Sequence, residues 1–151
     1  MKIAIAVVGH ENWGKSATLK KFAGTAHKKW VEINGEWFWV KHMSNDDIMG
    51  ELYFWLKGFI EKYKDTYGLV FALCPDFENS EKKTKMILEM LQKLNVEIRF
   101  FVLDKNYNNK KPISASEISA LKKYGVVHLI DGTAESSMRA DLLKKYISKI
   151  K

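Results

Sequence analysis

One eight-residue segment, Gly9 to Ser16, restricts the fold of this chain more than any other feature. Its sequence, GHENWGKS, matches the pattern G-x-x-x-x-G-K-[ST] without departure. An apolar run, residues 2–8, precedes the segment, and residues 16–22 favour a short helix that ends near Gly24. The pattern therefore predicts a tight loop between a buried strand and a helix, whose backbone N–H groups point at a bound anion.

The residue types in this loop suit the phosphates of a nucleoside triphosphate. The Lys15 ammonium is expected between the β- and γ-phosphates. The Ser16 hydroxyl is expected to bind Mg²⁺, a cation that prefers oxygen ligands. An ordinary glycine-rich turn is the alternative, and the matching spacing and flanking segments argue against it. The predicted phosphate-binding residues are Gly9, Asn12, Trp13, Gly14, Lys15, Ser16 and Ala17.

The rest of the chain alternates between strand and helix patterns. Two aromatic-rich runs flank Asn34-Gly35, the dipeptide that favours a two-residue hairpin turn. We predict one α/β domain over residues 1–151, in three layers, with a mainly parallel sheet of about six strands, one antiparallel hairpin strand, and helices on both faces. Strands are expected at 2–8, 30–33, 36–41, 69–74, 97–103 and 126–130. After the first helix, further helices are expected from Asp46 or Asp47 to about 64, from 79 or 80 to 94, and at 114–124 and 134–150.

Charge and hydropathy limit the partners. The net charge of +7 comes almost entirely from lysine, and Arg99 and Arg139 are the only arginines. Because nucleic-acid readers rely on arginine and these lysines are scattered along expected helices, nucleic acid is a possible but not a favoured partner. No apolar stretch is long enough to cross a membrane, and the first apolar run is too short for a signal peptide. We therefore expect a cytoplasmic protein without a membrane partner.

The segment Val7-Val8-Gly9-His10, followed by Gly14-Lys15-Ser16, resembles the loop of elongation-factor-type GTPases. A hairpin straight after the first helix resembles the Ras-like arrangement. This resemblance implies a P-loop NTPase fold, GTP and GDP with Mg²⁺ as ligands, and slow switch-type hydrolysis. ATP in place of GTP stays open.

Two other segments partly match that family. After the third strand these GTPases carry D-x-x-G, and Asp47-Ile48-Met49-Gly50 has this form a few residues late. The resemblance implies Asp46 or Asp47 as the acidic partner of Mg²⁺, and the first turn of a helix is the alternative. Where the family has N-K-x-D, this chain has Asp104-Lys105-Asn106-Tyr107. Thr133-Ala134 resembles the pair that closes over the base, so the implied base-binding residues are Asp104, Lys105, Thr133 and Ala134.

Catalysis is expected to be slow. Lys15 is the main catalytic candidate, because phosphoryl transfer depends on positioning and charge stabilisation. In the translational GTPases a histidine after D-x-x-G positions water. Here His42, before the acidic pair, is a weaker candidate, and a structural role is its alternative. We expect no arginine near the loop that could act as an internal arginine finger, because Arg99 lies at a strand and Arg139 in the last helix.

Two other functions stay open. An ATP-binding ATPase or small kinase fits the loop, although kinases usually need several arginines to clamp phosphates. A non-hydrolysing, nucleotide-gated module would bind a protein partner through exposed aromatic side chains. The aromatic residues that motivate it are Trp30, Trp37, Phe38, Trp39, Tyr53, Phe54 and Trp55.

Overall fold

A single sheet lies at the centre of the computed structural model, which describes residues 1–47 and 50–150. In the described part of the chain its six strands run in the order β2-β3-β4-β1-β5-β6. Strand β2 is antiparallel to β3, and every other neighbouring pair is parallel. The predicted mainly parallel sheet with one antiparallel hairpin strand is confirmed. The strands are β1 (Ile3–Val8), β2 (Trp30–Ile33), β3 (Glu36–Lys41), β4 (Gly68–Leu73), β5 (Glu97–Leu103) and β6 (Val126–Ile130).

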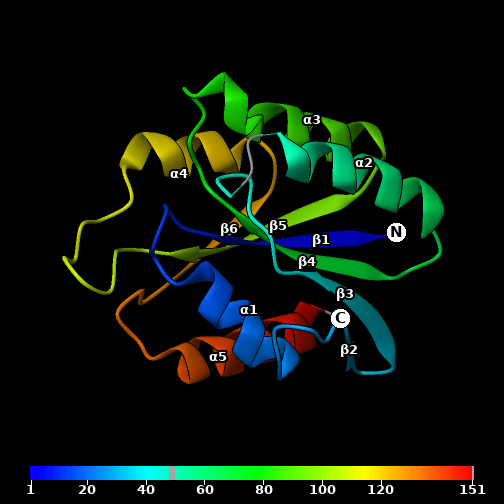
Figure 1. Cartoon of the computed structure of the whole chain (residues 1–151), viewed down its shortest axis with the longest axis horizontal. Helices are drawn as coiled ribbons and strands as arrows, with labels where there is room; N and C mark the ends of the chain where they lie inside the picture. The colour runs from blue at the N-terminus through cyan, green and yellow to red at the C-terminus, as the bar shows by residue number, and fades with distance from the viewer. Residues whose placement is uncertain (48–49, 151) are drawn as a thin grey trace.

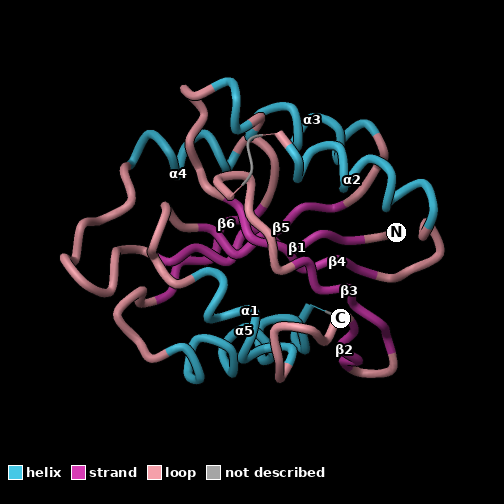
Figure 2. The backbone as a smooth tube through the Cα atoms, in the orientation of Figure 1, coloured by secondary structure: helices cyan, strands magenta, loops and turns pink. Residues whose placement is uncertain are grey.

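Helices cover both faces of the sheet, as predicted. Helices α1 (Lys15–Ala23) and α5 (Ser136–Ile150) lie on one face. Helices α2 (Glu51–Lys62), α3 (Thr84–Lys93) and α4 (Ala115–Lys122) lie on the other (Figure 1). Figure 2 shows the resulting three layers, with the strands between two layers of helix. Among the described helices, none combines the length and the apolar character that a membrane span needs.

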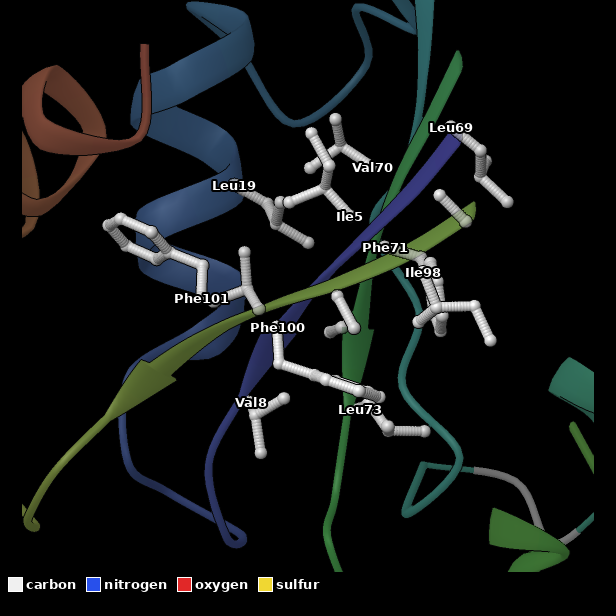
Figure 3. Packing of buried hydrophobic residues seen from close by; sticks show 14 of the residues in the cluster. Ile5, Val8, Leu19, Leu69, Val70, Phe71, Leu73, Ile98, Phe100 and Phe101 are labelled. Carbon is white, nitrogen blue, oxygen red and sulfur yellow. The ribbon is translucent and has the colours of Figure 1, made fainter. Parts of the chain in front are cut away.

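The core explains why the central strands are continuous apolar runs. Every residue of β1 and β4 is buried, because helices cover both faces of these strands. Leu19 of α1 packs toward Ile5 on one face, and Phe100 lies on the other (Figure 3). This packing fixes the carboxyl end of β1, from which Gly9 begins the loop.

Two predicted helix starts are wrong. Helix α2 begins at Glu51, not at Asp46 or Asp47. The Asp47 carboxylate instead accepts a hydrogen bond from the Ser44 N–H at 2.7 Å and closes a turn. Helix α3 begins at Thr84, and Asn79 caps a separate 3₁₀ helix, Ser80–Lys82. Residues 48 and 49 of the D-x-x-G match lie outside the described residues.

Candidate functional site

The Gly9–Ser16 loop connects the carboxyl end of β1 to α1, as predicted. Asn12 and Gly14 have positive φ angles of 65° and 94°, which turn the chain back on itself. The Trp13 N–H donates to the His10 carbonyl at 3.1 Å and closes the turn. Gly14 is the N-cap of α1 and supplies no side-chain hydrogen bond to the helix. The first N–H groups of α1 therefore have no cap side chain and suit an anion.

Arg139 of α5 packs against this loop, a contact that the sequence did not predict. The side chain is 4% exposed, and its Nη2 donates to the Gly14 carbonyl at 3.2 Å. Its Nε donates to Thr18 Oγ1 at 2.8 Å, and its Nη1 donates to the Ala134 carbonyl at 2.6 Å. Burial lowers the pKa of Arg139. The guanidinium thus joins the loop, α1 and α5, and each of its three nitrogens donates a hydrogen bond.

Lys15 and Asp46 form an ion pair that is almost fully buried. The Lys15 ammonium lies 3.1 Å from Asp46 Oδ2, and the two side chains are 6% and 5% exposed. It also donates to the carbonyls of Gly9 and His10, at 2.6 and 3.0 Å. Burial by itself raises the pKa of Asp46, but the Lys15 charge and hydrogen bonding with Ser44 outweigh it and hold that pKa below its usual value. Asp46 is therefore a charged carboxylate beside the loop.

Asn45 holds Asp46 in this place. Strand β4 lies between β1 and β3, so the segment after β3 has to cross the end of β4 to reach Lys15. The buried Asn45 side chain fixes this crossing: its Oδ1 accepts from the Cys74 N–H at 2.6 Å. Its Nδ2 donates to Thr84 Oγ1 at 2.9 Å and to the Cys74 carbonyl at 3.2 Å. No local sequence pattern points to Asn45, because its partners are 29 and 39 positions away.

A cleft of about 550 Å³ lies beside the loop, and the three predicted metal ligands, Ser16, Asp46 and Asp47, are among the residues that line it. Within residues 1–47 and 50–150, no group of three or more His, Cys, Asp or Glu side chains forms a metal site. A hydroxyl and one or two carboxylates nevertheless fit Mg²⁺, which keeps water and phosphate oxygens as its other ligands. The cleft is lined by Glu11, Asn12, Trp13, Gly14, Lys15, Ser16, Ser44, Asp46, Asp47, Tyr107 and Asn108.

The predicted base-binding residues lie together at the ends of β5 and β6. Their hydrogen bonds are made within and between the two loops that follow these strands. Asp104 Oδ1 accepts from the Gly132 N–H at 2.9 Å. A Cβ atom at Gly132 would lie 1.9 Å from the Lys105 carbonyl oxygen, so only glycine fits this approach. The Thr133 hydroxyl donates to Asp131 Oδ1 at 2.7 Å, and the Ala134 carbonyl accepts from Arg139. None of the four predicted residues belongs to the cleft lining given above.

Tyr107 and Asn108 reach the cleft instead. They lie in a turn in which the Asn106 N–H donates to the Lys111 carbonyl, and the Lys110 N–H donates back to the Asn106 carbonyl, each at 2.9 Å. The Asn108 N–H also donates to Asn106 Oδ1 at 3.0 Å. The Tyr107 side chain is 52% exposed beside the loop. The sequence signal for Tyr107 was its place in the segment that stands where the GTPases carry N-K-x-D.

The two histidines near the site have structural partners. His42 Nε2 donates to the Lys28 carbonyl at 2.9 Å, and His42 lines a separate cavity beside Trp39. The structure therefore does not bring His42 to Lys15. In the loop, His10 Nε2 lies 2.7 Å from Glu117 Oε2. Glu117 also completes the predicted capping box of α4, so it joins this helix to the loop.

The aromatic residues proposed for a partner divide into buried and exposed sets. Phe38 is fully buried in the core. Trp37 and Phe54 are 51% and 65% exposed, and the others lie between these extremes. The exposure of some rings is thus confirmed, and a protein partner stays a prediction.

Known proteins give the chain no family assignment. No protein-family model, curated protein or solved structure matches it.

Proposed function

We propose that the cleft binds a nucleoside triphosphate with Mg²⁺ and that the chain is a slow NTPase of the GTPase type. The observation that carries this proposal is the Lys15–Asp46 pair beneath an open helix N-terminus. A buried ammonium that bonds to two carbonyls of its own loop is placed to exchange them for phosphate oxygens. Asp46 and Ser16 would hold Mg²⁺, whose charge would offset that of the phosphates.

The cleft lining favours slow hydrolysis. Phosphoryl transfer needs positioned cations and a positioned water molecule. Among the described residues that line the cleft, Lys15 is the cation, and none is a histidine or an arginine. The Arg139 guanidinium is held by hydrogen bonds to Thr18 and Gly14 and does not point into the cleft. A partner that supplies a further cation would accelerate the reaction, as the proposed switch requires.

GTP is the proposed nucleotide from the resemblance of the Lys105 segment, and ATP is the second candidate. The Asp104–Gly132 hydrogen bond favours ATP as the competing nucleotide. It occupies an acceptor that recognition of guanine would need. We propose that the ring of Tyr107 supplies a stacking face that accepts either purine. The expected preference for guanine over adenine is therefore small.

The first prediction tests the phosphate site. Lys15→Met removes the ammonium but keeps an unbranched side chain, so binding of Mg²⁺-tripolyphosphate, GDP and ADP should all be lost. Lys20→Met is the matched control, because Lys20 is an exposed lysine of the same helix. Isothermal titration with the three ligands measures the effect. Unchanged affinity in Lys15→Met, with the fold intact by circular dichroism, would remove the basis of the proposal.

The second prediction tests the base. Tyr107→Ala should weaken GDP and ADP about 5- to 160-fold, because stacking on an aromatic ring contributes about 1–3 kcal/mol. Tripolyphosphate affinity should stay constant, and Tyr107→Phe should bind as the wild type does. Equal losses for tripolyphosphate and nucleotide would show that Tyr107 shapes the phosphate site rather than the base site.

One further assay distinguishes the three alternative functions. With radiolabelled γ-phosphate, appearance of inorganic phosphate identifies hydrolysis, and label on an added acceptor identifies a kinase. Nucleotide binding without either product identifies the non-hydrolysing module. The first result is the expected one, at a slow rate.

A further inference from the structure

A second cavity, of about 660 Å³, lies at the opposite end of the sheet from the nucleotide cleft. It lies where β3 and β4 begin, whereas the nucleotide cleft lies where parallel strands end. The turn between α2 and β4 supplies one side, and the hairpin of β2 and β3 supplies the other. The cavity is lined by Trp30, Glu36, Trp37, Asp65, Thr66 and Tyr67.

Aromatic rings form the walls of this cavity. The rings of Trp30 and Trp37 are perpendicular, with an interplanar angle of 89° and centroids 6.5 Å apart. Trp30 is itself held by Trp39, at 4.5 Å and 85°, so its ring has a fixed orientation. Tyr67 supplies a third ring. Such rings carry negative charge density on their faces and attract cations that reach them.

The charges at this cavity also favour a cation. Its lining contains the carboxylate residues Glu36 and Asp65 and neither lysine nor arginine among the described residues, although the chain as a whole carries +7. The lining therefore offers carboxylates and rings to a cation, with the Met1 ammonium bound close by at the Lys64 carbonyl.

The chain's own lysines already use neighbouring rings in this way. The Lys41 ammonium lies 4.2 Å from the ring centroid of Trp55, and that of Lys29 lies 5.8 Å from the centroid of Trp39. The Lys2 ammonium lies 6.0 Å from Tyr67, at the outer limit of such contacts. Among the described residues no such cation contact involves Trp30 or Trp37, and the half-exposed Trp37 ring can reach an external cation.

We propose that this cavity binds a quaternary ammonium group. Its methyl groups spread the charge over an apolar surface, so the group can contact the rings without giving up strong hydrogen bonds to water. The carboxylates would supply the long-range attraction. Free small molecules and methylated lysine side chains of proteins share this chemistry. The proposal does not depend on nucleotide binding.

The test compares choline with its uncharged carbon analogue, 3,3-dimethylbutan-1-ol, in titrations followed by NMR of the tryptophan indole N–H groups. Choline should bind saturably and shift the Trp37 signal, whereas the analogue should not. Trp37→Ala should weaken choline about fivefold or more, since one desolvated cation–π contact contributes about 1–2 kcal/mol. Phe54→Ala, which removes another exposed ring, is the matched control and should bind choline normally.

Asp65→Asn should also weaken choline, because it removes one negative charge without changing the shape of an exposed side chain. A trimethyllysine peptide that binds more tightly than choline and than its unmethylated form would support a protein source for the group. Choline at equal or greater affinity would support a free small molecule. Absence of choline binding, equal binding of the carbon analogue, or normal choline affinity in Trp37→Ala would each overturn the proposal.

Discussion

At the scale of single residues, the two glycines at the ends of α1 distinguish the cost of a strained backbone conformation from the cost of a steric clash. Gly14 and Gly24 have similar positive φ angles, 94° and 99°. A Cβ atom at Gly24 would meet nothing within 4 Å, whereas one at Gly14 would lie 2.6 Å from Arg139 Nη2. Any added side chain at Gly14 must therefore displace the guanidinium that braces the loop.

Urea unfolding of two alanine variants measures this difference. Gly24→Ala should lower the free energy of unfolding by about 1–2 kcal/mol, the usual cost of a left-handed conformation for a residue with a Cβ atom. Gly14→Ala should cost at least about 1 kcal/mol more, because a hydrogen bond of the buried Arg139 is disturbed as well. Equal losses in the two variants would show that Arg139 adapts without cost.

At the scale of elements, the segment between β3 and α2 is the part of the site that depends most on a single side chain. Asn45 makes hydrogen bonds to the end of β4 and to the first residue of α3. These bonds carry the chain across β4 and leave Asp46 beside Lys15. The metal-binding carboxylate of the proposed site is thus positioned by a neutral amide one residue earlier.

Asn45→Ala should therefore act on both stability and metal dependence. We expect a loss of about 2–3 kcal/mol in unfolding free energy, because the Cys74 N–H becomes a buried donor without its partner. The Mg²⁺-dependent part of nucleotide affinity should fall too. Asn79→Ala is the matched control, since Asn79 caps the exposed 3₁₀ helix and should cost about 1 kcal/mol without affecting the metal. A normal Mg²⁺ titration in Asn45→Ala would show that Asp46 keeps its place unaided.

The sequence predicts those elements whose signals are local. Apolar runs give the central strands, and Asn34-Gly35 gives the hairpin, because each pattern acts within a few residues. The acidic pair Asp46-Asp47 suggested that a helix begins there. The hydrogen bonds of Asn45 to residues far away in the sequence prevent this. Arg139 reaches Gly14 only after α5 has packed on α1, at a separation of 125 positions. The conformation of the loop is therefore predictable from the sequence, but the contacts that Asn45 and Arg139 make to support the site are not.

At the scale of the whole molecule, the two proposed sites lie at opposite ends of one sheet. The nucleotide cleft combines three segments that lie far apart in the sequence, residues 11–16, 44–47 and 107–108. The cation cavity combines the β2–β3 hairpin with the turn before β4. The two linings share no residue, and the fully buried strands β1 and β4 lie between the two sites.

Ligand-linked stability tests this separation. A ligand present at 100 times its Kd stabilises the folded chain by about 2.7 kcal/mol, which for a domain of this size raises Tm by about 5–11 °C. Because the sites share no residue, the free energies of stabilisation by Mg²⁺-GTP and by choline should add when both ligands are present. Lys15→Met should abolish only the nucleotide contribution, and Trp37→Ala should reduce only that of choline. A combined effect clearly smaller or larger than the sum would mean that the sheet couples its two ends, and nucleotide state would then control occupancy of the cation cavity.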